Sequence, residues 1–213
     1  MAKALYKEIR NRFEGYSFLA DVREQASDPM GLIRLQIQLL GDTLRKQIYQ
    51  ISDADRGAKM IEEMLQETKV LIILDDVDEH EQLNALAGDL NWFGPGSRII
   101  VTTRDKRLRL GQVDENNIYC PEGLDNNQSL RLFSKHAFRR DQPRDDYRFL
   151  SGEMVKYADG LPLALEIWGS FLYHVKGKEK WEAALQQLKE VPHNDILKKL
   201  KISYDGLNSN EKT

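Results

Sequence analysis

Two carboxylates, Asp75 and Asp76, stand directly after a continuous hydrophobic run. That run, VLIIL over residues 70–74, is typical of a strand buried on both faces of a parallel sheet. Side chains that follow such a strand point into the crevice where α/β proteins bind ligands, and a carboxylate there suits Mg²⁺. The alternative is that the aspartates only cap the next turn.

An arginine, Arg104, follows a second hydrophobic run in the segment GSRIIVTTRD, residues 96–105. The planar guanidinium donates two parallel hydrogen bonds, which suits a phosphate group. If the two strands are neighbours, Arg104 lies in the same crevice as the aspartates. The alternative is a surface arginine in a basic cluster. Nucleic-acid contact is disfavoured there because Asp105 interrupts the cluster and the surrounding chain is acidic.

A third segment, GLPLAL at residues 160–165, places Pro162 and Leu163 at the start of an apolar helix. Taken alone, it is explained by core packing. Several patterns are absent from the sequence. It contains no phosphate-binding loop of the form G-x-x-x-x-G-K-[ST], no G-x-S-x-G nucleophile elbow and no histidines at metal-ligand spacing. An independent enzyme with its own nucleophile is therefore the least favoured interpretation.

The elements that must position these residues alternate strand and helix in the first half of the chain. Strands are expected at 16–22, 70–74, 98–103 and 117–120, and helices at 2–12, 32–44 and 55–67. Asp78 and Glu81 form a capping-box-like pair before a further helix. Helices alone follow, at 128–138, 147–158, 162–175, 179–190 and 194–201. The pattern predicts an α/β parallel sheet flanked by helices and then an all-α subdomain.

Composition narrows the classes of protein. With 41% hydrophobic and 31% charged residues among 213, the chain has enough apolar side chains for a core, which excludes wholesale disorder. The single cysteine forms neither an intrachain disulfide nor a multi-cysteine zinc site, which favours a cytosolic protein. The longest apolar stretch, 161–175, is too short to span a membrane. A net charge of −3 gives no general attraction to nucleic acid.

Four segments, taken in order, resemble the NB-ARC module of plant disease-resistance receptors. They are FLADVRE at 18–24, LIILDDVD at 71–78, GSRIIVTTRD at 96–105 and GLPLAL at 160–165. Residues 119–138 and 202–207 also look like later parts of that module. Asp78, together with FLADVRE, looks like the branch that carries an N-terminal TIR domain. The resemblance covers essentially the whole chain.

The resemblance implies a P-loop NTPase-like fold and a switch between an ADP-bound resting state and an ATP-bound active state. It makes Asp75 the Mg²⁺-associated acid and Asp76 the residue in the catalytic-base position. Arg104 would sense the terminal phosphate. Pro162, with Leu163 beside it, would contribute to nucleotide binding, Pro162 lying against the adenine. ADP or ATP with Mg²⁺ is the implied cofactor, and ATP hydrolysis is expected to be slow.

The family pattern also implies a division into domains. Residues 1–123 would be a partial nucleotide-binding α/β domain that lacks the P-loop and first strand, 124–192 a helical subdomain, and 193–213 the start of a winged-helix subdomain. On this interpretation the chain is an internal slice of a receptor, from a truncated gene or an incomplete gene model. We therefore expect these residues alone to bind ADP or ATP weakly or not at all, and to show no ATPase activity.

The expected partners are an adenine nucleotide, the TIR and leucine-rich-repeat domains of a full-length receptor, and further copies of the chain, with no direct nucleic-acid contact and no membrane segment. The expected location is cytoplasmic or nucleocytoplasmic. Two other functions stay open. One is a non-nucleotide interaction or decoy fragment that associates with related receptors, which the missing P-loop favours. The other is a different regulatory ATPase of the same STAND class, sharing LDDV and TTR but not FLADVRE.

Overall fold

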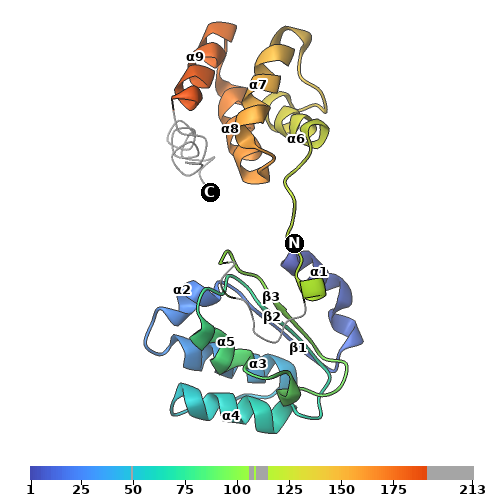
Figure 1. The fold of residues 1–213 in the computed structure, drawn as a ribbon, viewed down its shortest axis with the longest axis vertical. Helices are drawn as coiled ribbons and strands as arrows, with labels where there is room; N and C mark the ends of the chain where they lie inside the picture. Colours follow the sequence, from blue (N-terminus) through green and yellow to red (C-terminus); the bar gives the residue numbers. More distant parts are fainter. Residues whose placement is uncertain (49, 106–107, 109–114, 191–213) are drawn as a thin grey trace. The chain divides into compact units, whose positions relative to one another are not determined.

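Two compact units make up the chain, Met1–Asn117 and Ile118–Thr213. The computed structural model describes residues 1–48, 50–105, 108 and 115–190 (Figure 1). The first unit, blue to green in Figure 1, is an α/β domain, and the second, yellow to red, is helical. The expected winged-helix start at 193–213 and the helix expected at 194–201 lie outside the described residues.

Among the described residues of the first unit, three strands form a central parallel sheet. The strands β1 (Gly15–Leu19), β2 (Val70–Leu74) and β3 (Arg98–Val101) stand in the order β1-β2-β3. All five residues of β2 are buried, as the hydrophobic run predicted. In the register, Leu19 pairs with Leu74, and Leu74 with Val101. The carboxyl ends of the three strands therefore meet at one edge of the sheet.

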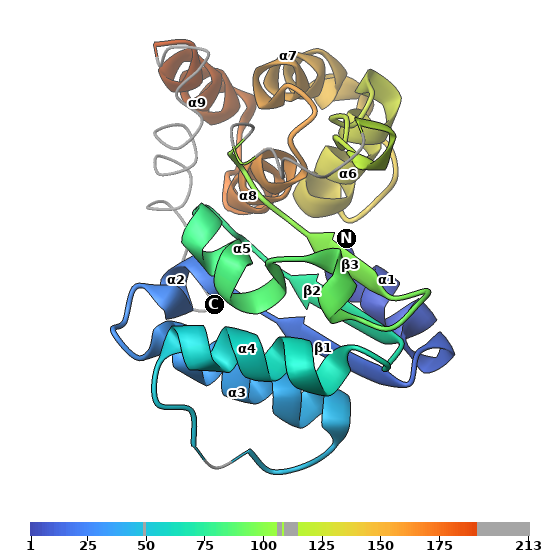
Figure 2. The same ribbon diagram turned by 60° about the horizontal axis from the view of Figure 1, so that its bottom comes forward.

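Helices cover the two faces of this sheet unequally, as Figures 1 and 2 show. The helices α3 (Gly31–Leu44), α4 (Ala54–Leu65) and α5 (His80–Ala87) lie on one face. Their apolar side chains form a single core with alternate residues of β2. The other face carries α1 (Ala2–Ile9), which continues as a 3₁₀ turn at Arg10–Arg12. The short helix α2 (Val22–Ala26) follows β1.

Side-chain alternation along β1 separates these two faces. Ser17 points toward α3, where its hydroxyl donates to Asp42 Oδ2 at 2.7 Å. Tyr16 and Phe18 point the opposite way, and the ring of Tyr6 from α1 packs edge-on against them at centroid distances of 6.0 and 5.5 Å. No residue of α1 is buried, so this helix covers its face only partly.

A buried amide joins the three helices on the covered face. The side chain of Gln36, which lies on α3 and is fully buried, donates from Nε2 to the carbonyl oxygen of Ala54 at 2.8 Å and to that of Ala85 at 2.9 Å. These acceptors belong to α4 and α5. The bond to Ala85 is buried and the bond to Ala54 is partly buried, and an unpaired carbonyl away from solvent is costly.

We expect Gln36→Leu to destabilise the first unit by about 1–3 kcal/mol, because the buried bond to the Ala85 carbonyl and the partly buried bond to the Ala54 carbonyl are lost. Urea unfolding followed by circular dichroism measures the change. Gln38→Leu is the matched control, since Gln38 lies on the same helix but is exposed, with its Nε2 3.4 Å from the Phe18 oxygen. A control variant as unstable as Gln36→Leu would show that the amide bridge contributes nothing particular.

Within residues 118–190 of the second unit, four helices pack around an aromatic core. They are α6 (Asn126–Phe138), α7 (Arg148–Ala158), α8 (Pro162–His174) and α9 (Lys178–Lys189), with a 3₁₀ turn at Asp145–Tyr147 before α7. Trp181 contacts the rings of Phe133, Phe138 and Tyr147, and its Nε1 donates to the Val175 oxygen at 3.0 Å. Each of these helices was expected from the sequence within a few residues.

Three expectations from the sequence are wrong in detail. The strand expected at 117–120 is absent: a 3₁₀ turn at Glu115–Asn117 is followed by irregular chain. Ile118 and Tyr119 are 51% and 74% exposed, so neither supplies the buried face that a strand needs. The predicted strand at 16–22 ends at Leu19, and Val22 begins α2. The capping box before α5 uses Glu79 and Gln82, one residue later than predicted.

Candidate functional site

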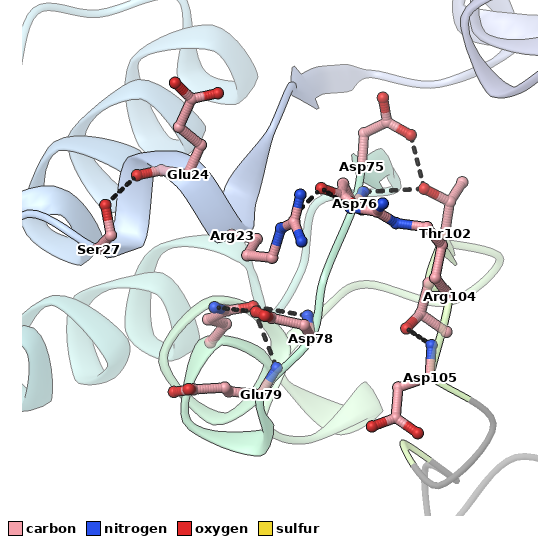
Figure 3. A network of polar contacts seen from close by, with 12 residues as sticks. Arg23, Glu24, Ser27, Asp75, Asp76, Asp78, Glu79, Thr102, Arg104 and Asp105 are labelled. Carbon is pink, nitrogen blue, oxygen red and sulfur yellow. Dashed lines mark hydrogen bonds and ion pairs between the residues drawn. The ribbon is translucent and has the colours of Figure 1, made fainter. Parts of the chain in front are cut away.

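Three of the predicted site residues, Asp75, Asp76 and Arg104, lie together at the carboxyl ends of β2 and β3 (Figure 3). The backbone hydrogen bonds between β2 and β3 continue past the ends of these strands. Thr102 N–H donates to the Leu74 oxygen at 2.9 Å, and Val77 N–H donates to the Thr102 oxygen at 2.9 Å. Val77 is 1% exposed. This buried anchor fixes the loop that carries Asp75 and Asp76.

A threonine hydroxyl organises both carboxylate residues. Thr102 Oγ1 donates to Asp75 Oδ1 at 2.6 Å and accepts the backbone N–H of Asp76 at 2.9 Å. One hydroxyl thus sets the orientation of the Asp75 side chain and the position of the Asp76 backbone. Thr102 was not predicted as a site residue, although it lies in the TTR segment that drew attention to Arg104.

The backbone of Asp76 adopts a left-handed conformation, with φ 58°. Asparagine and aspartate tolerate this region better than other non-glycine residues. In this conformation the Asp76 carbonyl accepts the backbone N–H of Arg23 at 3.1 Å, and the Asp75 carbonyl accepts that of Val22 at 2.9 Å. The start of α2 is therefore hydrogen-bonded to the loop after β2.

Two arginines share the Asp76 carboxylate. Arg104 donates from Nε to Oδ1 and from Nη2 to Oδ2, each at 3.0 Å, which is a two-point contact. Arg23 Nε forms an ion pair with Oδ2 at 3.1 Å. The Asp76 side chain is 25% exposed, against 47% for Arg23 and 70% for Arg104. Arg23 belongs to the FLADVRE segment, but its spacing gave no sign that it would reach Asp76.

An open groove of about 400 Å³ lies over these residues and is lined by Arg23, Asp76, Val77, Asp78, Arg104 and Asp105. This volume falls within the range of small-molecule sites. Asp78, at the groove wall, accepts the side-chain N–H of Gln82 on Oδ1 at 2.9 Å. The groove is thus lined by two arginine guanidinium groups and three aspartate carboxylates. This arrangement suits an anion that binds together with a cation.

A Mg²⁺ ion fits this site only together with a ligand. The described residues contain no group of three or more His, Cys, Asp or Glu that could hold a metal by itself. Asp75 offers one carboxylate, oriented by Thr102. Mg²⁺ is commonly held by one or two carboxylates, with phosphate oxygens and water completing the octahedron. The residues present therefore suit Mg²⁺ that arrives with a nucleotide.

The structure brings Asp75, Asp76 and Arg104 together, as the order of motifs predicted. Pro162 and Leu163 lie in the second unit, at the start of α8, where Leu163 is 53% exposed. The preceding Gly160 has φ +70°, and its carbonyl accepts the Leu124 N–H at 2.9 Å. The site assembled here consists of residues of the first unit.

The parallel sheet, with carboxylates and an arginine at its carboxyl edge, defines a domain of the P-loop NTPase-like α/β class. The NB-ARC domain model matches residues 1–143. The chain therefore belongs to the NB-ARC family, and the predicted resemblance to the TIR-type plant disease-resistance branch is confirmed.

Several plant disease-resistance proteins are similar to the chain over nearly its whole length. It is 44% identical over 214 residues to disease resistance protein RPV1 of Vitis rotundifolia, covering 100% of this chain and 15% of that protein. It is 41% identical over 215 residues to TMV resistance protein N of Nicotiana glutinosa, covering 97% and 18%. With disease resistance protein RUN1 of Vitis rotundifolia the identity is 42% over 215 residues, covering 100% and 16%. The chain spans less than a fifth of the length of these relatives.

Within the described ranges, no helix is both long enough and apolar enough to cross a membrane.

Proposed function

We propose that the chain is part of the adenine-nucleotide-binding switch module of a plant immune receptor. The observation that carries this proposal is that Asp75, Asp76 and Arg104 meet at the carboxyl edge of the sheet, where Asp76 and Arg104 line an open groove. Ligands of open α/β sheets bind at this edge. The similarity to named disease-resistance proteins supports the receptor part of the proposal.

Each site residue has a role that follows from its chemistry. Asp75 would hold Mg²⁺ together with a bound nucleotide, because its carboxylate is already oriented by Thr102. Asp76 stands where it would orient or deprotonate an attacking water. Arg104 contacts the terminal phosphate with its planar fork. For Pro162 and Leu163 we propose a part in nucleotide binding, with Pro162 against the adenine.

The module would act by exchanging ADP for ATP, with slow hydrolysis returning it to the resting state. If the terminal phosphate of ATP binds one conformation of the module better than the other, it shifts the population toward that conformation. In a full-length receptor we propose that TIR and leucine-rich-repeat domains read out this change, and that the receptor works in the cytoplasm or nucleocytoplasm. Copies of the activated receptor would then associate.

Calorimetry with Mg²⁺-ADP tests the proposal in two polypeptides. The first is the 213-residue chain, which contains no G-x-x-x-x-G-K-[ST] segment. The second is a longer chain in which such a segment precedes residue 1. We expect weak binding, or none that calorimetry detects, by the first. We expect stoichiometric binding by the second, because backbone N–H groups and the loop lysine supply the main phosphate contacts.

A longer chain that folds but binds neither ADP nor ATP would contradict the proposal and favour the interaction-fragment alternative. Low-micromolar, stoichiometric binding by the 213-residue chain would instead contradict the expectation that these residues alone bind weakly.

A further inference from the structure

The Asp76 carboxylate is bonded to the guanidinium groups that would otherwise bind an incoming phosphate. Both fork nitrogens of Arg104 that face Asp76 are engaged, at 3.0 Å each, and Arg23 completes the contact at 3.1 Å. A carboxylate and a phosphate present similar oxygen pairs to a guanidinium. We infer that Asp76 is an internal anion that competes with a phosphate group for Arg104. This inference rests on the proposed function only in taking the phosphate to be that of an adenine nucleotide.

The two arginines differ in how firmly they are tied to Asp76. Arg23 contacts Asp76 twice, through its guanidinium at 3.1 Å and through its backbone N–H to the Asp76 carbonyl at 3.1 Å. Arg104 contacts Asp76 through its side chain, which is 70% exposed and lines the groove. Arg104 is therefore the partner that exchanges, while Arg23 retains the Asp76 carboxylate and balances its charge.

Because Arg104 can exchange Asp76 for a phosphate, ligand binding changes the contacts of Asp76. Without a phosphate, Arg104 neutralises Asp76. When a phosphate draws Arg104 away, Asp76 becomes more available to a water molecule, held by Arg23 alone. The affinity measured for the phosphate is reduced by the cost of breaking the Asp76–Arg104 contact. An exposed ion pair is weak, so this cost is small enough for a ligand to overcome.

The test measures the binding of inorganic pyrophosphate to the 213-residue chain at low ionic strength, by NMR of the arginine Nε–H resonances. We expect Asp76→Asn to bind pyrophosphate roughly fivefold to tenfold more tightly than the wild type, because the competing charge is removed. Asparagine also tolerates the left-handed backbone at this position. In the wild type, the Arg104 resonance should shift more than that of Arg23.

Three further variants separate competition from a general change of charge. Asp78→Asn removes a carboxylate from the same groove, but Asp78 is bonded to Gln82 rather than to an arginine. Asp28→Asn breaks a comparable exposed ion pair, that of Asp28 with Arg34 at 3.1 Å. We expect a smaller gain than for Asp76→Asn in the first and none in the second. Adding Arg104→Gln to Asp76→Asn should abolish the gain.

Asp76→Gly is the second variant of the site, since glycine accepts positive φ without steric cost. It should reproduce the gain, and circular dichroism checks that each variant folds. Affinity equal to or below the wild type in both Asp76 variants, or no detectable binding in either, would overturn the inference. A gain equal in Asp76→Asn and Asp78→Asn would also overturn it. None of these outcomes involves adenine, so failure here is distinct from failure of the longer chain to bind ADP.

Discussion

Gly160→Ala is expected to destabilise the helical unit by about 3 kcal/mol. Gly160 has φ +70°, a conformation that costs an L-residue about 1–2 kcal/mol. A β-carbon at this position would lie 2.6 Å from the Leu124 oxygen and 2.8 Å from the Leu124 nitrogen, both of which are backbone atoms that cannot rotate away. Overpacking of this kind typically adds about 1–3 kcal/mol.

Urea unfolding followed by tryptophan fluorescence measures this change, because Trp168 and Trp181 are 1% and 2% exposed within the helical unit. Gly152→Ala is the matched control. Gly152 lies inside α7, and a β-carbon added there would have no heavy atom within 4 Å, so alanine should stabilise the helix by up to about 1 kcal/mol. Equal unfolding midpoints for the two variants would contradict the steric argument.

The backbone conformation of Gly160 and its close approach to Leu124 therefore explain why glycine stands at the start of GLPLAL, which the sequence alone did not indicate. The sequence indicated a proline-initiated apolar helix, and α8 begins at Pro162 as expected. It did not indicate that the turn before α8 passes against the backbone of Leu124. A contact between segments far apart in sequence depends on packing, whereas a helix start depends on local chemistry.

The same distinction separates what could be predicted in the first unit. The strand at 70–74 was predicted with its observed bounds because a fully buried strand leaves an unbroken hydrophobic run. Asp75, Asp76 and Arg104 were placed at one edge because carboxyl ends of parallel strands meet there. These inferences need only the order of the elements and the period of the side chains.

The partners of those residues could not be predicted, since each depends on a contact between distant segments. Arg23 reaches Asp76 because the start of α2 is bonded to the loop after β2. Thr102 reaches Asp75 because the register of β3 against β2 places its hydroxyl beside that carboxylate. The strand expected at 117–120 failed for a related reason: its short β-like pattern has no buried face to pack.

Asp75→Ala is expected to impair ATP hydrolysis far more than ADP binding, in the longer chain that carries a phosphate-binding loop. Asp75 is oriented by the 2.6 Å contact from Thr102, so its carboxylate is fixed before any ligand arrives. A group that holds Mg²⁺ stabilises charge that develops in the transition state, and such preorganised contacts are worth roughly 100-fold or more in turnover. We expect kcat to fall by at least about 100-fold and the affinity for ADP by less than about tenfold.

Asp28→Asn is the control for this comparison, because Asp28 is an exposed carboxylate outside the groove lining and accepts the Met30 N–H on Oδ1 at 2.9 Å. An asparagine oxygen can still accept that hydrogen bond, so hydrolysis should change little. Measuring turnover and ADP affinity on the same preparations separates loss of the metal contact from loss of the fold. If Asp75→Ala lost ADP affinity and turnover in equal proportion, Asp75 would act in ground-state binding. Unchanged turnover would remove it from the site altogether.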